Sequence, residues 1–301
     1  VSGHGTFDGH IAGTIENPAF VGVLDAAKLQ LNGQDIDSVH GEIVFGADVL
    51  RAENISFKQN GGAYTMNCTT NLATQVLDGT LRVENGDVHA LLAIANLKND
   101  ILDGRLNGTI RLAGTLENPL AELSAVVDEG TASGYEIRDM ALDLKLADHI
   151  VTIRELRGKQ GEGVFAAKGR IPLNGTAMDA QFAANGIAAG MVAKAAGAAA
   201  DVRGTIDLAV QFGGTIENPQ ANASVEVKEG GIGASTFDDM TGLLSLKGGV
   251  ISIDQLLVKK KLGDRSYSAS AKGKVPVRSL TAADDERLAA PEQIDLTVSL
   301  D

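Results

Sequence analysis

Residue types that carry out catalysis or hold metal ions are sparse in this chain, and their spacing matches no reaction centre. Cys68 is the only cysteine, so neither an intrachain disulfide nor a cysteine-based zinc site can form. No nucleophile elbow and no phosphate-binding glycine loop occurs. The five histidines lack both the HExxH and the His-x-His spacing of zinc ligands: His4, His10, His40, His89 and His149. We therefore predict no catalytic residue, no metal and no cofactor.

Two acidic clusters, Asp238-Asp239 and Asp284-Asp285-Glu286, have the charge of a cation site without its spacing. Neither shows the Asp-x-Asp-x-Asp-Gly order of a calcium-binding loop. The second cluster lies in residues 281–291, which have the composition of a loop. We interpret both clusters as solvated turns.

Apolar side chains, in contrast, recur with a spacing that suits a binding surface. Every second residue from 206 to 212 is apolar, and the same alternation runs through 140–146, 224–228 and 250–254. This period is typical of strands with one apolar and one polar face. The interaction that these residues can make is therefore apolar contact with hydrocarbon. The candidate lining residues are Ile110, Leu112, Leu123, Val127, Leu142, Leu144, Leu146, Val151, Ile153, Ile206, Leu208, Val210, Phe212, Val225, Val227, Leu244, Leu246, Ile251 and Ile253.

The elements that must position these residues are antiparallel strands. Turn signals such as Asp78-Gly79, Asn174-Gly175 and Gly230-Gly231 separate the alternating runs. Two segments have helical spacing instead. One contains Val88, Leu91, Leu92 and Ala95 with Asp87 as a cap, and the other runs from Ile187 into Ala198-Ala199-Ala200. We predict a mainly β meander of about six strands per repeat, with one short helix in each repeat.

A hexapeptide, Gly-Thr-[Ile/Leu]-Glu-Asn-Pro, begins at Gly13, Gly114 and Gly214, so its copies lie 101 and 100 residues apart. Apolar positions align at the same offsets, as in Ile43, Leu144 and Leu244. The chain is therefore predicted to be an array of repeats, 1–107, 108–203 and 204–301, the first beginning and the last ending within a repeat. The glycines should allow a bend. The prolines Pro18, Pro119 and Pro219 should interrupt the sheet ladder.

Composition narrows the class of function. The net charge of −13 argues against nucleic acid and anionic lipid surfaces, which attract clustered cations. Glycine is frequent at 36 residues and aromatic residues make up only 4%, which favours a long β-structure over an aromatic-rich enzyme core. No stretch approaches the roughly 20 apolar residues that span a bilayer. Without atypical capping repeats, we expect the sequence to be a window of a longer protein.

These hexapeptides, the Gly-Thr strands at 108–113 and 204–213, the short helices before them and the amphipathic strands after them resemble the TamB and AsmA-like envelope proteins of diderm bacteria. That family is similar to the bridge-like lipid transfer proteins. The resemblance covers nearly the whole chain. It implies an elongated antiparallel β-taco, which is an open rolled sheet with a hydrophobic groove. It also implies a periplasmic location within a longer inner-membrane-anchored protein.

For function, the resemblance implies that phospholipid acyl chains move along the groove between the inner and outer membranes. It also implies an outer-membrane β-barrel partner, bound through parts of the parent protein that lie outside this sequence. The family's anchor and terminal region have no counterpart here, so no docking residue can be assigned.

Three functions fit the pattern. Two short helices can cover little of the apolar face of so long a sheet. The sheet must therefore close on itself, pack against a second sheet, or bind a ligand on that face. A lipid conduit uses the apolar face. An assembly factor for outer-membrane β-barrel proteins would instead use edge backbone groups to hold client strands. A passive β-solenoid stalk would have a solidly packed interior, but solenoid coils are about 20–30 residues long, far shorter than these repeats.

Overall fold

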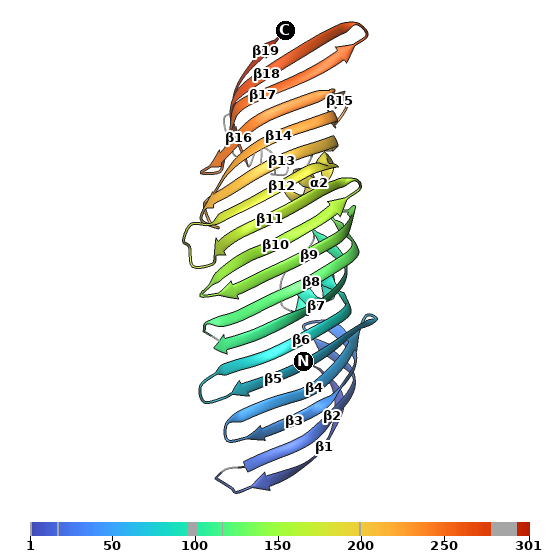
Figure 1. The fold of residues 1–301 in the computed structure, drawn as a ribbon, viewed down its shortest axis with the longest axis vertical. Coiled ribbons are helices and arrows are strands. Elements are labelled where there is room, and N and C mark those ends of the chain that lie inside the picture. Colours follow the sequence, from blue (N-terminus) through green and yellow to red (C-terminus); the bar gives the residue numbers. More distant parts are fainter. Residues whose placement is uncertain (1, 17, 95–100, 116, 199, 278–293) are drawn as a thin grey trace. The chain divides into compact units, whose positions relative to one another are not determined.

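The computed structural model describes residues 2–16, 18–94, 101–115, 117–198, 200–277 and 294–301. These residues form one open antiparallel sheet of 19 strands with two short helices, and the sheet does not close into a barrel. The strands follow one another in chain order (Figure 1), and β14 pairs with both β15 and β16. The predicted mainly β, antiparallel meander is therefore confirmed.

The first half of the chain contains nine strands and α1. Their bounds are β1 (Ser2–Gly13), β2 (Pro18–Leu31), β3 (Gln34–Gly46), β4 (Val49–Gln59), β5 (Gly62–Asn71), β6 (Val76–Asp87), α1 (Val88–Ile94), β7 (Leu102–Thr115), β8 (Pro119–Ala132) and β9 (Tyr135–Ala147).

The second half contains ten strands and α2. Their bounds are β10 (Ile150–Gln160), β11 (Gly163–Pro172), β12 (Asp179–Ala188), α2 (Ala189–Ala195), β13 (Val202–Gly214), β14 (Pro219–Ile232), β15 (Ser235–Thr236), β16 (Asp239–Lys247), β17 (Val250–Leu262), β18 (Arg265–Pro276) and β19 (Asp295–Leu300).

The chain divides into two compact units. Unit 1 comprises Val1–Thr131 and Arg138–Arg154, and unit 2 comprises Ala132–Ile137 and Glu155–Asp301. Each unit contains one helix. In unit 1, α1 packs against β7 and also contacts β3 and β6. In unit 2, α2 packs against β13 and β12.

The first predicted helix is confirmed and the second is shorter than predicted. Val88 begins α1, and the Ala90 N–H donates to the Asp87 carboxylate at 3.0 Å, as expected of a cap. Ala95 lies outside the described residues. The predicted start of the second helix at Ile187 is wrong, because β12 continues to Ala188. That helix ends at Ala195, since Gly197 with a φ of 76° turns the chain out of it.

The hexapeptides form the turns between β1 and β2, β7 and β8, and β13 and β14. In the last two, the Thr115 and Thr215 N–H groups donate to the carbonyls of Asn118 and Asn218 at 3.3 and 3.2 Å. The Asn N–H returns a 3.1 Å bond to the threonine hydroxyl in each. Each turn begins at a glycine of positive φ, and each following strand begins at the proline: Gly13 and Pro18, Gly114 and Pro119, Gly214 and Pro219. The predicted bend is confirmed, and the register resumes at the proline, because Pro18 and Pro219 pair with Gly13 and Gly214.

Bulges reverse the alternation inside several strands. One extra residue separates Ala52 from Ile55 in β4, and the same occurs between Val83 and Gly86 in β6 and between Ala184 and Ile187 in β12. A bulge inserts one residue, so the apolar side chains stay on one face although their numbers change from even to odd.

A side chain of the neighbouring strand holds each of these three bulges. The N–H of Asn54 donates to Asn67, that of Asn85 to Asn107 and that of Gly186 to Asp207, all at 2.7–2.8 Å. We call Asn67, Asn107 and Asp207 the bulge clamps. They satisfy backbone donors that the sheet ladder leaves free.

Candidate functional site

The cross-strand register of unit 2 places apolar residues on one face of the sheet in four successive rows. Antiparallel partners share a face, so each row can be followed from strand to strand. The rows are Gly169-Ala180-Phe212-Ala221-Leu246-Ile251-Val275, Ala167-Phe182-Val210-Ala223-Leu244-Ile253-Gly273-Leu296, Phe165-Ala184-Leu208-Val225-Gly242-Leu256-Ala271-Val298 and Ile187-Ile206-Val227-Met240-Val258-Ala269-Leu300. None of these rows contains a charged residue.

Unit 1 has the same arrangement from β2 to β7. Its rows are Phe20-Phe45-Leu50-Thr70-Leu77-Gly114, Gly22-Ile43-Ala52-Cys68-Gly79-Leu112, Ile55-Met66-Leu81-Ile110 and Val39-Phe57-Tyr64-Val83-Gly108. The polar members all come from β5: Tyr64, Cys68 and Thr70. Burial raises the pKa of Tyr64, whose ring stacks on Phe57 with centroids 4.5 Å apart, so this group is neutral near pH 7. We call these rows of units 1 and 2 the apolar face.

The predicted lining residues lie on eight strands. β7 carries Ile110 and Leu112, β8 carries Leu123 and Val127, β9 carries Leu142, Leu144 and Leu146, and β10 carries Val151 and Ile153. β13 carries Ile206, Leu208, Val210 and Phe212, β14 carries Val225 and Val227, β16 carries Leu244 and Leu246, and β17 carries Ile251 and Ile253. The register brings all ten residues of unit 2 together in the four rows given above.

Burial separates these residues into two groups. Val127, Ile206 and Val227 are 0%, 6% and 2% exposed, so the protein itself covers them. Leu112 and Phe212 are exposed, and the other fourteen predicted lining residues are half-buried. The half-buried and exposed residues are the ones that a ligand can reach.

Prediction from sequence missed part of the apolar face. Phe182, Leu256 and Val298 lie in its rows, as do small residues of β18 such as Ala271 and Gly273. Alanine and glycine give little hydrophobic signal, although Leu296 and Val298 alternate visibly in the sequence. The bulge between Ile253 and Leu256 also hides the continuity of β17, because the inward positions change from odd to even.

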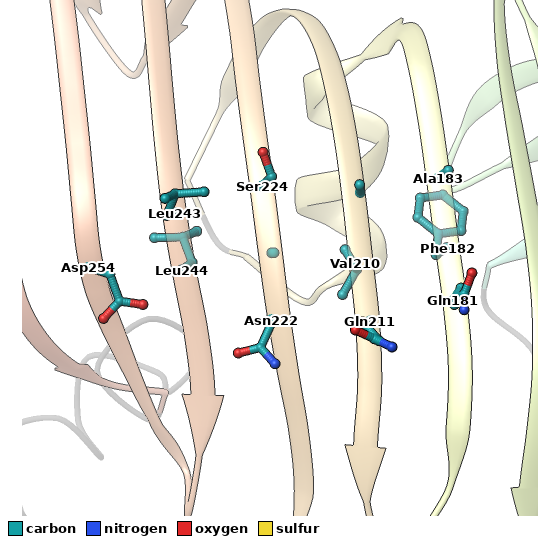
Figure 2. Close-up of a pocket in the computed structure, with 12 residues that line it drawn as sticks. Gln181, Phe182, Ala183, Val210, Gln211, Asn222, Ser224, Leu243, Leu244 and Asp254 are labelled. Carbon is teal, nitrogen blue, oxygen red and sulfur yellow. The ribbon is translucent and has the colours of Figure 1, made fainter.

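The opposite face is polar. One row across eight strands reads Lys168-Gln181-Gln211-Asn222-Ser245-Ser252-Lys274-Asp295. Figure 2 shows the residues around a shallow hollow of about 530 Å³, which Gln181, Gln211 and Asn222 of this row line together with Asp254 and with Phe182, Val210 and Leu244 of the neighbouring apolar row. Leu243 is exposed on this face beside the hollow. The two faces therefore differ strongly in polarity although the strands between them are shared.

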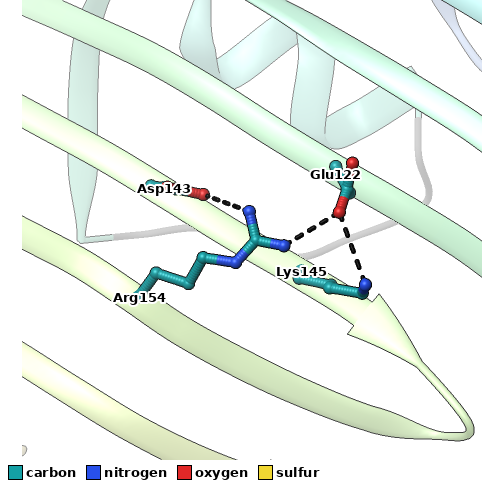
Figure 3. Close-up of polar contacts among 4 residues, drawn as sticks. All are labelled: Glu122, Asp143, Lys145 and Arg154. Atoms are coloured by element: carbon teal, nitrogen blue, oxygen red, sulfur yellow. Dashed lines mark hydrogen bonds and ion pairs between the residues drawn. The ribbon is translucent and has the colours of Figure 1, made fainter.

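On the polar side of unit 1, an ion-pair network joins β8, β9 and β10 (Figure 3). The Arg154 guanidinium donates to Glu122 at 2.8 Å and to Asp143 at 3.2 Å, and the Lys145 ammonium lies 3.5 Å from Glu122. The hydrogen bond from Arg154 is the largest cause lowering the pKa of Glu122, and Lys145 adds to it. Asp143 and Lys145 alternate with Leu142, Leu144 and Leu146, so the network fixes which side chains of β9 face away from it.

This network should make the pairing of β8 with β9 sensitive to acid. The folded-state pKa of Glu122 lies below its ordinary value of 4.5, so its stabilising effect is present above that pH and is lost as the pH falls through the lowered pKa. We expect the protection factors of the amides in β8 and β9, that is, the exchange rates of an unfolded chain at the same pH divided by their own, to fall over this range. Arg154→Gln should weaken the acid dependence. An unchanged profile in that variant would contradict the assignment to this ion pair.

Two further kinds of feature, a metal site and a membrane-spanning helix, can be checked among the described residues. Within the parts of the chain that the structure describes, no group of three or more His, Cys, Asp or Glu is placed to hold a metal ion. The same search of the described residues finds no helix with the length and hydropathy to cross a membrane. Asp284-Asp285-Glu286 lies outside the described residues. Comparison with known proteins finds no matching family model, no matching curated protein and no matching solved structure.

Proposed function

We propose that the chain binds phospholipid acyl chains along its apolar face and guides them as one segment of a conduit between two membranes. The observation that carries the proposal is the uncharged apolar face, which eight strands of unit 2 share. Four rows about 7 Å apart on eight strands about 4.8 Å apart give roughly 1,000 Å². Among the described residues, α2 packs against β12 and β13 at one end of this footprint, and the half-buried and exposed side chains of the other rows are left for a ligand to cover.

The finer architecture is part of the proposal. We infer an open rolled sheet whose apolar face lines a hydrophobic groove, built from repeats of about 100 residues. Matching turns at Gly114 and Gly214 and matching bulge clamps at Asn107 and Asp207 support this reading. The groove holds and guides lipid without chemical change. Location in the periplasm and an outer-membrane β-barrel partner belong to the same proposal, and rest on the sequence resemblance.

The test is lipid capture by this 301-residue chain. The purified chain is incubated with vesicles of phosphatidylethanolamine and phosphatidylglycerol, separated from them, and analysed by mass spectrometry. A photoreactive residue replaces Leu246 on the apolar face or, as the control, Gln211 on the polar face. We expect lipid adducts at Leu246 and few at Gln211. No retained lipid, or equal capture at both positions, would reject the conduit. Adducts with proteins along the sheet edges in cell extracts would favour an assembly factor instead.

A further inference from the structure

Along β7, β13 and β14, the apolar face is closed at one end of the strands and more open at the other, whereas Met240, Val258 and Ala269 at the closed end's level on β16–β18 are half-buried. In β13, Ile206 beside α2 is 6% exposed, whereas Phe212 beside the hexapeptide turn is 36% exposed. In β7, Leu106 and Leu112 are 7% and 37% exposed. We call the end of unit 2 at Ile187, Ile206 and Val227 the helix end, and the end at Phe212, Leu246 and Ile251 the proline end.

Several contacts hold the helix end of unit 2 shut. The Gln160 side-chain carbonyl accepts a 2.8 Å hydrogen bond from the N–H of Ala188, the residue before α2. Gly190 packs against the Tyr135 hydroxyl with no space for a side chain. The Lys194 ammonium lies 5.2 Å from the centre of the Tyr135 ring. Ala189, Gly190 and Met191 of the helix are all buried. Access for a ligand therefore lies at the proline end.

The open part of the strands has the length of a lipid tail. From Leu208 to Phe212 there are four residue steps, which span about 14 Å at about 3.4 Å per step. The hydrocarbon core of a bilayer is about 30 Å thick, so the tails of one leaflet extend about 15 Å. Ala180 and Val275 are buried at the proline end too, at 7% and 8% exposed, so the accessible surface there comes mainly from Phe212, Leu246 and Ile251.

From this gradient we infer that a bound phospholipid lies along the strands of unit 2, with its headgroup beside the hexapeptide turn and its tail ends against the closed helix end. The inference rests on the proposed function and adds the orientation of the ligand. Solvent at the proline end allows the headgroup to stay hydrated. On the apolar face the helix end presents Ile187, Ile206 and Val227. Hydrocarbon makes no hydrogen bonds, so tail ends can contact these side chains without leaving a polar group unpaired.

The orientation can be read by placing one fluorophore at either end of β14. Cys68→Ala removes the only cysteine, and Glu217→Cys or Ala234→Cys then supplies a label in an exposed turn at the proline end or the helix end. The thirteen steps of β14 separate these turns by about 44 Å. The probes are phosphatidylcholine with a nitroxide on its headgroup and phosphatidylcholine with a nitroxide at the end of one tail.

We expect the headgroup nitroxide to quench the label at 217 several-fold more than the label at 234, and the tail-end nitroxide to quench the label at 217 less than the headgroup nitroxide does. Equal quenching of both labels by the headgroup nitroxide, or the opposite order, would overturn the orientation while leaving lipid binding intact. Lipid content of each labelled sample is measured separately. If no phosphatidylcholine stays bound, the proposed function fails, and the orientation falls with it.

Discussion

Aspartate at both Val210 and Leu244 should remove bound lipid from unit 2 while the sheet stays folded. Both residues lie in one apolar row, and both are half-buried, so the carboxylates remain hydrated in the lipid-free chain. Against hydrocarbon, each charge costs about 2.5–3.5 kcal/mol at the centre of a bilayer. Two such charges therefore weaken binding by about 5 kcal/mol or more, a loss of over ~10³-fold. The readout is retained phospholipid per chain, determined by mass spectrometry.

The matched control places the same charges one residue away on the other face. Gln211 neighbours Val210, and Leu243 neighbours Leu244 but is 48% exposed on the polar face. Gln211→Asp with Leu243→Asp changes charge and hydropathy in the same direction without touching the apolar face. We expect lipid retention close to that of the unmodified chain. If the control loses as much lipid as the Val210 and Leu244 variant, general charge or folding explains the loss, and the apolar face is not the binding surface.

Gly214→Ala should destabilise unit 2 by about 2–5 kcal/mol. Gly214 has a φ of 70°, a conformation that costs an L-residue about 1–2 kcal/mol, and an added Cβ would overlap the Asn218 carbonyl oxygen. Forcing the turn apart adds about 1–3 kcal/mol of packing strain. Gly114 faces the same obstacle, since its added Cβ would lie 2.6 Å from the Asn118 oxygen. Urea unfolding, with hydrogen exchange in β13 and β14, measures the loss.

Gly233→Ala separates the two causes. Gly233 also has a positive φ, 57°, but nothing lies within 4 Å of an added Cβ. The free energy of unfolding of this variant should therefore fall only by the conformational term, about 1–2 kcal/mol. Equal losses in Gly214→Ala and Gly233→Ala would show that the turn tolerates the side chain, and that the hexapeptide glycine serves only its backbone angle.

Much of the fold could be predicted because strand alternation, helix capping and turn formation depend on residues that are close together in the sequence. Alternation identified the apolar faces of β13, β14 and β16, and the Asp87 cap identified the start of α1. The hexapeptide turns followed from glycine and proline geometry alone. The repeat boundaries at 107/108 and 203/204 stay a prediction, because the described contacts divide the chain into two units instead.

The rest depends on contacts between residues distant in sequence. The bulge in β4 lies at Asn54, which has a positive φ of 51°, and no glycine between Ala52 and Ile55 marks it. Only the neighbouring strand reveals it. The closed helix end likewise arises where α2 meets β12 and β13, and a strand pattern shows alternation but not which positions a helix covers. The alternation therefore predicts Ile206 to be accessible lining, although it is buried beside α2.

The bulge clamps imply that the two faces tolerate mutation differently. A bulge clamp such as Asp207 lies on one strand and fixes the register of the next. Without it, that strand could slip by one residue, which would move its apolar side chains to the polar face of the sheet. An aliphatic residue such as Leu208 can be exchanged for another of similar size with little penalty. The side chains that align the strands thus lie on the polar face, and the apolar face can change its aliphatic residues without changing the register.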